Sequence, residues 1–299
     1  MELPLLRLDG SVKQNPHMRA FWGATCSFFI AFVGWFALAP VALDVIHSIG
    51  MCENQIYVVE DEPTRPAFIA YKNIKTGKSF CVHGKSADGK DCAEIPEDES
   101  AIPACADDAS SAECTFAKEN KYDFDTLNAV KCVCGKGTEC KNTIANAGIA
   151  SVGSTVFVRV ALGTLLERFG PVNVQSSLLT YGGFWVAVSS QITAPWNYTL
   201  LRFLIGCAGA TFVTNQFWCS MMFAPNVVGT ANATAAGWGN LGGGVTQIFI
   251  IWALVIPMRS MGINDDLSWR LAMLVPAVLF FTVATIVKTC CWDSEMPTP

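Results

Sequence analysis

Charged residues and histidines are scarce in this sequence. Asp, Glu, Lys and Arg make up 15% of its 299 residues, below the roughly 25% typical of soluble domains, and there are 3 histidines. The chain also lacks a nucleotide-binding motif, a catalytic set of His, Cys and Ser, and a metal-ligand cluster in its apolar segments. These absences argue against an enzyme, and we expect no cofactor, no bound metal and no nucleic-acid partner.

The charges that are present gather in one segment. Residues 51–141 carry 11 Lys and Arg and 17 Asp and Glu, whereas the other 208 residues carry 9 and 8. Outside this segment the chain is apolar enough for a membrane, where a spanning helix needs about 20 mostly apolar residues. The windows that meet this length are residues 20–43, 144–166, 172–193, 198–223, 228–256 and 269–291.

Basic residues near the ends of these windows predict the orientation. Most of them fall on one side, taken as cytoplasmic: Arg7, Lys13, Arg19, Arg168 and Lys288, with Arg259 as the main exception. The sequence therefore predicts an all-α multi-pass membrane protein, which we place in the plasma membrane. Its parts would be a cytoplasmic N-terminus (1–19), a first transmembrane segment (20–50), an extracellular insert (51–141), five further helices (142–291) and a cytoplasmic tail (292–299).

Cysteines also concentrate in the insert. It holds 8 of the 13 in the chain: Cys52, Cys81, Cys92, Cys105, Cys114, Cys132, Cys134 and Cys140. An even number of cysteines in a small extracellular segment indicates disulfides that hold a domain with little core of its own. Zinc ligation by "CVCGKGTEC" is the alternative, but the insert has a single histidine, His83, and no CxxC pair.

One arginine lies deep in an apolar window. Arg159 sits in "GSTVFVRVALGTLL", and an arginine at membrane depth costs at least about 2.5–3.5 kcal/mol, so it usually faces a cavity and has a function. No Asp or Glu lies deep in any of the six windows, so the guanidinium lacks a partner and is suited to bind an anionic substrate through bidentate hydrogen bonds. Arg202 lies near the outer interface, and we interpret it as structural.

The segment "AAGWGNLGGGVTQ" places five glycines between residues 237 and 244. Small residues let membrane helices pack closely, and Gly239 and Gly243 fit a G-x-x-x-G seam. Five glycines exceed the needs of one seam. The surplus would expose backbone amides to a ligand or let the helix bend, and Asn240 adds a side chain that can donate and accept hydrogen bonds.

This segment resembles the signature motif of the nitrate/nitrite porters, a branch of the major facilitator superfamily. Two further stretches resemble helices of that family: "NAGIASVGSTVFVRVALGTLLERFGP" its second helix and "ATFVTNQFWCSMMF" its fourth. The sequence is most similar to those of eukaryotic, algal-type high-affinity nitrate transporters. The resemblance implies the N-terminal six-helix half of a major-facilitator bundle, with an unusually long insert between helices 1 and 2.

The resemblance also implies roles for individual residues. Arg159 falls on the substrate-binding arginine of the family, and Phe212 on an aromatic that packs against the anion. Gly237, Gly239, Asn240, Gly242, Gly243 and Gly244 fall on the glycine-rich signature. Gly163, Glu167, Arg168 and Gly170 resemble the cytoplasmic gate motif, with glutamate where aspartate is commoner.

The resemblance thus implies a secondary transporter that imports nitrate or nitrite with protons by alternating access. Family members have about twelve helices, so we expect a missing C-terminal half or a second copy as partner. A truncated gene model, a deliberate fragment, a pseudogene-like remnant and a true half-transporter all remain open. The alternatives in function are a membrane-anchored receptor that acts through its disulfide-rich ectodomain and an accessory partner of a full-length transporter. The insert itself could recruit an accessory protein.

Overall fold

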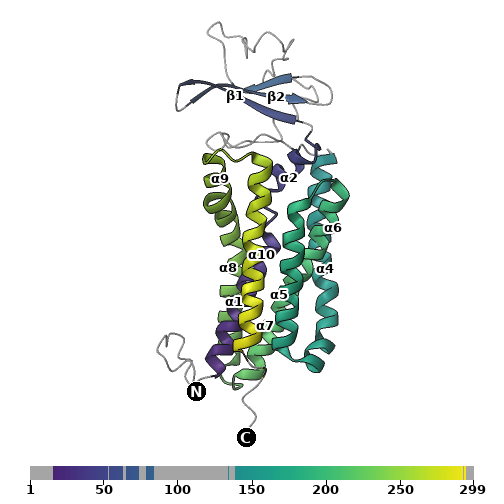
Figure 1. Cartoon of the computed structure of the whole chain (residues 1–299), viewed down its shortest axis with the longest axis vertical. Coiled ribbons are helices and arrows are strands. Elements are labelled where there is room, and N and C mark those ends of the chain that lie inside the picture. The colour runs from purple at the N-terminus through teal and green to yellow at the C-terminus, as the bar shows by residue number, and fades with distance from the viewer. Residues whose placement is uncertain are drawn as a thin grey trace. The chain divides into compact units, whose positions relative to one another are not determined.

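The computed structural model describes residues 16–52, 54–62, 65–73, 79–83, 134, 139–291 and 293. It divides into two compact units, Met1–Ala42 with Asn146–Pro299 and, separately, Leu43–Ala145. The first unit is built from helices and the second contains a small sheet (Figure 1).

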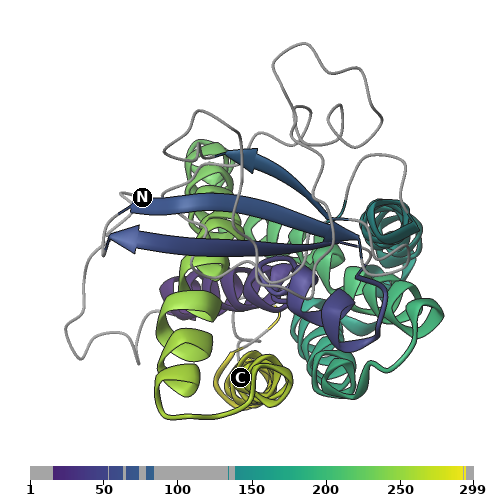
Figure 2. The same ribbon diagram turned by 90° about the horizontal axis from the view of Figure 1, so that it is seen from above.

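Six helical rods make up the described part of the first unit. They are α1 (Pro16–Phe36), α4 (Glu139–Phe169), α5 (Pro171–Val188) with the short η3 (Ser189–Gln191), the continuous run α6 (Pro195–Gly206), η4 (Cys207–Ala210) and α7 (Thr211–Met222), the continuous run α8 (Val228–Ile248), η5 (Phe249–Val255) and α9 (Ile256–Ser260), and α10 (Asp265–Cys290). Helix α1 packs against α8, α10 and α7, and α5 packs against α10, so α1 runs through the interior of the bundle (Figures 1 and 2).

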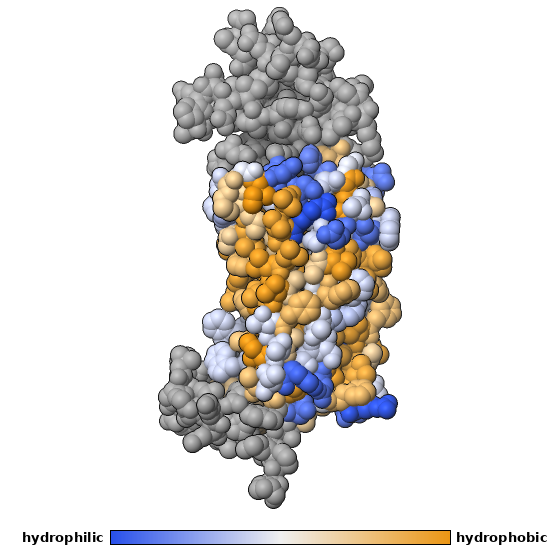
Figure 3. Space-filling view, in the orientation of Figure 1, coloured by the Kyte–Doolittle hydropathy of each residue, from blue (hydrophilic) through white to orange (hydrophobic). Residues whose placement is uncertain are grey.

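Three of these rods are long and apolar enough to cross a membrane: Glu139–Phe169, Val228–Ser260 and Asp265–Cys290. The stretch Ala20–Phe36 of α1 is apolar but shorter. One face of the bundle carries a broad apolar band between more polar ends (Figure 3). The chain is therefore a helical membrane protein, as the sequence predicts.

The rods differ from the predicted windows mainly at their ends and breaks. The window 20–43 is too long, because α1 ends at Phe36 and a turn precedes the separate helix α2 (Ala42–Ser48). Pro40 explains this end, since its ring would clash with the carbonyl group of Phe36 and it has no N–H to donate. The window 228–256 contains a π-helix, η5, which ends two residues before Pro257. The missing N–H of this proline again disturbs the α-helical hydrogen bonds.

The second unit contains strands that an all-α prediction does not include. Strands β1 (Asn54–Glu62), β2 (Arg65–Asn73) and β3 (Ser79–His83) form an antiparallel sheet in the order β1-β2-β3. Val58 pairs with Ile69, and Ile69 pairs with His83. Stretches such as "IYVV" in β1 are rich in β-branched and aromatic residues, which favour strands.

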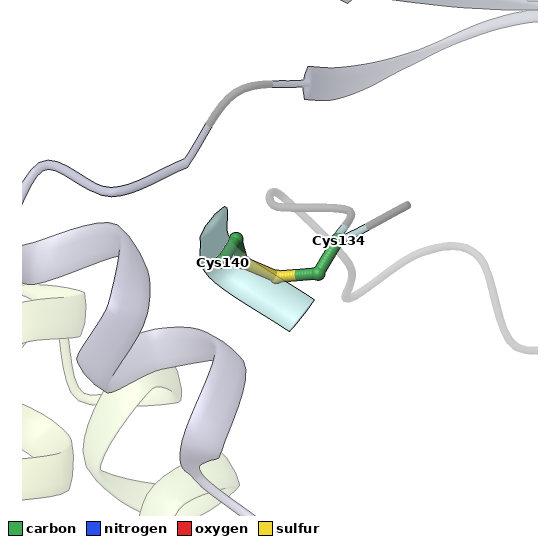
Figure 4. The surroundings of a disulfide bond; sticks show 2 residues. All are labelled: Cys134 and Cys140. Carbon is green, nitrogen blue, oxygen red and sulfur yellow. A yellow bond between two sulfur atoms is a disulfide. The ribbon is translucent and has the colours of Figure 1, made fainter. Parts of the chain in front are cut away.

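A disulfide joins Cys134 and Cys140 in this unit, with Cα atoms 5.5 Å apart (Figure 4). Cys52 is also disulfide-bonded, and it forms a small apolar cluster with Ile46, Cys134 and Cys140. Two cysteines of "CVCGKGTEC" are therefore engaged with each other rather than with zinc. Of the other candidates, Cys81 lies in β3, while Cys92, Cys105, Cys114 and Cys132 lie outside the described residues, so the complete framework stays a prediction.

Aromatic rings seated on glycines hold the first unit together. Phe280 of α10 is fully buried, and a Cβ atom added to Gly34 would lie 2.0 Å from its ring. Added Cβ atoms on Gly182 and Gly183 of α5 would lie 2.6 and 2.8 Å from the same side chain. In lipid, helices associate through close packing rather than through a hydrophobic force, so these three glycines let α1, α5 and α10 meet around one ring.

Helix α5 begins at a glycine that no other residue can replace without strain. Gly170 has φ 78° and ψ 156°, a region that is essentially restricted to glycine. The backbone N–H of Val172 donates a hydrogen bond of 2.6 Å to Oδ1 of Asp293, and a Cβ atom on Gly170 would lie 2.7 Å from the Cγ atom of that carboxylate. The carboxylate of Asp293 therefore accepts a hydrogen bond from an N–H group at the start of α5 that lacks a helical partner, and it lies at the positive end of the helix dipole.

Two glycine substitutions test this arrangement. We expect Gly170→Ala to lower the free energy of unfolding by about 1–3 kcal/mol, because alanine is strained at a positive φ and would displace Asp293. Gly163→Ala is the matched control, since Gly163 lies within α4 with nothing within 4 Å of an added Cβ atom, and alanine favours a helix over glycine by about 1 kcal/mol. Thermal unfolding of both variants in detergent, followed by circular dichroism, checks this. Equal midpoints for the two would contradict it.

Candidate substrate-binding site

Arg159 lies on α4 and is exposed in this chain. Its Cζ atom lies over the ring of Phe212 on α7, 5.4 Å from the ring centroid, a cation–π geometry worth about 0.5–1 kcal/mol at an exposed position. The two described ion pairs, Arg259–Asp265 and Arg270–Asp266, do not involve it. The guanidinium is therefore backed by an aromatic ring and leaves its N–H donors available to an anion.

Phe212 is supported in turn by a second ring. The centroids of Phe212 and Phe28 are 5.6 Å apart, and Phe28 is fully buried on α1. Phe28 also packs edge-on against Phe32, with centroids 4.5 Å apart. A continuous aromatic contact thus runs from Arg159 through Phe212 to the centre of the bundle.

Gly239 of α8 creates the space for Phe28. A Cβ atom on Gly239 would lie 1.7 Å from Cδ1 of Phe28, closer than any two non-bonded carbon atoms approach. Arg159, Phe212 and Gly239 are therefore linked through Phe28, although they lie on three different helices. Sequence reasoning missed Phe28. The available signal was the series Phe28, Phe32 and Phe36, in which each residue follows the previous one by four positions.

The glycine signature divides into two faces. A Cβ atom added to Gly242 would lie 2.4 Å from the backbone carbonyl oxygen of Phe29, and one added to Gly243 would lie 3.2 Å from the ring of Phe36. With Gly239, they form the seam between α8 and α1. Oγ1 of Thr246 lies at this seam, 2.6 Å from the carbonyl oxygen of Gly242 in its own helix and 3.2 Å from that of Val33 in α1. The seam thus uses Gly242 as well as the predicted Gly239 and Gly243.

Gly237, Asn240 and Gly244 occupy the other face of α8. All three are exposed, and nothing lies within 4 Å of a Cβ atom added to either glycine. Asn240 has no described contact with Arg159. The structure therefore brings Gly239, Gly242 and Gly243 into the packing and leaves the remaining three signature residues on a free surface of this chain.

Hydrogen bonds fix α4, and with it Arg159, against its neighbours. Nε1 of Trp35 donates to Oγ of Ser151 at 2.7 Å, and Oγ1 of Thr155 donates to the carbonyl oxygen of Gly206 at 2.7 Å.

Nη1 of Arg202 donates to the carbonyl oxygen of Trp35 at 3.2 Å, at the end of α1, where carbonyl groups lack helical partners. Arg202 thus has a structural contact, in agreement with its interpretation from the sequence.

The predicted gate residues lie where α4 ends. Glu167 and Arg168 are exposed, and in the described part of the chain neither forms an ion pair; Arg168 lies over the ring of Phe169, with its Cζ atom 5.4 Å from the centroid. Gly163 faces open space and Gly170 caps α5. Sequence reasoning did not identify Asp293, which lies beyond the last window and reaches the turn through the tertiary structure.

No protein-family model and no solved structure matches the chain. Curated relatives do confirm the sequence resemblance. The chain is 43% identical over 143 residues to "High affinity nitrate transporter 2.5" of Arabidopsis thaliana, covering 47% of this chain and 28% of that protein. It is 34% identical over 146 residues to "Nitrate transporter 2.1" of Chlamydomonas reinhardtii, covering 49% of this chain and 26% of that protein. It is 30% identical over 117 residues to "Nitrate/nitrite transporter NrtP" of Picosynechococcus sp., covering 39% of this chain and 22% of that protein.

These relatives are transporters by name, not enzymes. The matched region spans less than a third of the length of each.

The two faces of α8 give a matched pair of variants. We expect Gly239→Ala to destabilise the protein by about 1–3 kcal/mol, the usual cost of overpacking, because the new methyl group must displace Phe28. Gly237→Ala should leave the unfolding midpoint unchanged or raise it, since that position is open. Thermal unfolding in detergent measures both. A Gly237→Ala variant as unstable as Gly239→Ala would show that helix flexibility, rather than contact with Phe28, sets the requirement for glycine.

Proposed function

We propose that this relative of the high-affinity nitrate transporters is the N-terminal, six-helix half of a secondary transporter that imports nitrate, with nitrite as the alternative anion. The observation that carries the proposal is Arg159, a cation on a membrane-spanning helix that is backed by Phe212 and has no described carboxylate partner. The names of the relatives support nitrate as the anion.

Arg159 would bind the anion, and Phe212 would support the arginine. Nitrate is planar, and the planar guanidinium group offers parallel N–H donors that match two of its oxygen atoms. Phe212 packs against one face of the guanidinium group. It excludes water from that side, which strengthens the hydrogen bonds from the guanidinium to the anion. Asn240 would contribute a further donor from α8 when the cavity closes.

Alternating access requires that α8 change its position or shape around this site. The seam glycines give α8 a smooth surface against α1 along which it can slide. The π-helical segment η5 follows the glycine segment in the same rod and precedes Pro257. Such π segments often occur at functional sites, so η5 is a suitable hinge between the glycine half of the rod and α9.

The surface around Arg159 supports a partner bundle. Gly148, Val152, Val156, Arg159 and Gly163 form one stripe of α4 at spacings of three and four residues, and nothing lies within 4 Å of a Cβ atom on either glycine. A charged side chain on such a stripe cannot face hydrocarbon at low cost, whereas exposed glycines suit contact with another helix. We propose that the missing C-terminal half, or a second copy of this chain, covers it.

Proton coupling and a plasma-membrane location complete the proposal. Both are implied by the family resemblance. Since no carboxylate lies deep in the six apolar windows, the proton would be carried by groups of the partner half or enter with the anion. The gate residues Glu167 and Arg168 would pair with that half at the cytoplasmic side.

The first test is uptake of isotopically labelled nitrate by the chain, alone and co-expressed with a C-terminal half from a relative. Arg159→Lys should reduce uptake at low nitrate at least tenfold, because it removes a charge-assisted hydrogen bond worth about 1.5–3 kcal/mol. Arg259→Lys is the control, since Arg259 pairs with Asp265 at 3.1 Å away from the site. Equal uptake by the Arg159→Lys variant and the wild type at normal surface expression would exclude Arg159 as the anion ligand.

A second test separates the transporter from a membrane-anchored receptor. Deletion of residues 53–140 removes the sheet and every candidate disulfide cysteine except Cys52, but leaves the helices that carry Arg159, Phe212 and Gly239. We expect nitrate uptake in the co-expressed system to remain within about threefold of the full chain, a change of less than 1 kcal/mol. Complete loss of uptake with normal membrane insertion would favour a receptor or accessory role for the insert.

A further inference from the structure

A groove of about 430 Å³ runs between α4 and α5, and neither Arg159 nor Phe212 lines it. Its walls are mostly apolar, and the residues that line it are Leu162, Leu165, Phe169, Asn173, Val174, Ser177, Leu178 and Tyr181. Because these residues belong to helices of the membrane bundle, the groove lies at the depth of acyl chains for most of its length.

Two cations lie at the end of the groove where α4 gives way to α5. Arg168 lies over the ring of Phe169, and Nζ of Lys288 on α10 donates a hydrogen bond to Oδ1 of Asn173. Phe169 and Asn173 both line the groove. Since Arg168 and Lys288 are among the basic residues that place this side in the cytoplasm, the groove is apolar toward the membrane centre and basic at the inner surface.

The carboxylates near these cations are Glu167 and Asp293, and neither lines the groove. Asp293 accepts a hydrogen bond from the backbone of Val172, so its charge is stabilised by the start of α5. Glu167 is exposed and does not line the groove. It follows Leu165 by two residues, which places it on the opposite side of α4 at 3.6 residues per turn.

We propose that this groove binds a phospholipid of the cytoplasmic leaflet with an anionic headgroup. One acyl chain lies along the leucines of the groove, and the headgroup lies between Arg168 and Lys288. Basic pockets between transmembrane helices on the cytoplasmic side are suited to anionic lipid headgroups, and that leaflet carries the anionic lipids. Lipid binding at this turn would hold Arg168, and so couple the predicted gate to the composition of the inner leaflet.

Photocrosslinking in nanodiscs tests the proposal independently of transport. The full chain is reconstituted in phosphatidylcholine with a minor fraction of phosphatidylserine that carries a diazirine in one acyl chain, and labelled peptides are mapped by mass spectrometry. We expect labelling of residues 162–181, and competition by unlabelled phosphatidylserine but not by phosphatidylcholine. Labelling should fall about fivefold in Arg168→Gln and about fivefold in Lys288→Gln. Each basic residue near the membrane surface contributes about 1 kcal/mol to the binding of anionic lipid, which is about a fivefold change in affinity.

Two further variants make the result specific. Ser177→Trp fills the groove and should abolish labelling of residues 162–181. Lys141→Gln, at the opposite end of α4, should leave it unchanged. Equal labelling by a phosphatidylcholine probe, or labelling unaffected by loss of both charges, would overturn the choice of an anionic lipid. An unlabelled segment 162–181 in the wild-type chain would overturn the lipid site and indicate that another helix fills the groove.

Discussion

The packing of aromatic rings onto glycines is the interaction on which the rest of this structure depends. In a membrane the surrounding lipid is as apolar as the side chains, so helices gain little by burial and must gain by fit. Phe280 against Gly34, Gly182 and Gly183, Phe28 against Gly239, and Trp35 against Gly209 follow the same design. Each ring enters the space where a side chain would be, and each fixes the distance between its helices.

The candidate site is an extension of this packing toward the surface. Phe28 rests on Gly239, Phe212 rests on Phe28, and Arg159 rests on Phe212. The position of the cation is therefore determined by α1, α7 and α8 as well as by α4. A change in α8 would be transmitted through two rings to Arg159, which gives the proposed alternating-access mechanism a physical connection between the glycine-rich helix and the anion site.

The exposed face of the bundle is as informative as its core. Arg159, Asn240, Gly237 and Gly244 all lie on surfaces that the described part of the chain leaves exposed. Glycine and charge are poor choices against lipid but good choices against another helix or a water-filled cavity. The same reasoning applies to the α4–α5 groove, whose walls are mostly apolar and which has basic residues at one end, as the proposed lipid site requires.

The sequence by itself determined the helical membrane class and singled out Arg159 and the glycine signature, because hydropathy, a charge in an apolar window and an excess of glycine are local properties. It did not determine the sheet in the insert, the end of α1 before Pro40 or the π-helix before Pro257, which depend on how propensity and proline chemistry compete in context. Only the tertiary structure decided which glycines form the seam, that Phe28 connects Gly239 to Phe212, and that Asp293 caps α5. These are contacts between residues far apart in the chain, and their partners are chosen by the packing of whole helices.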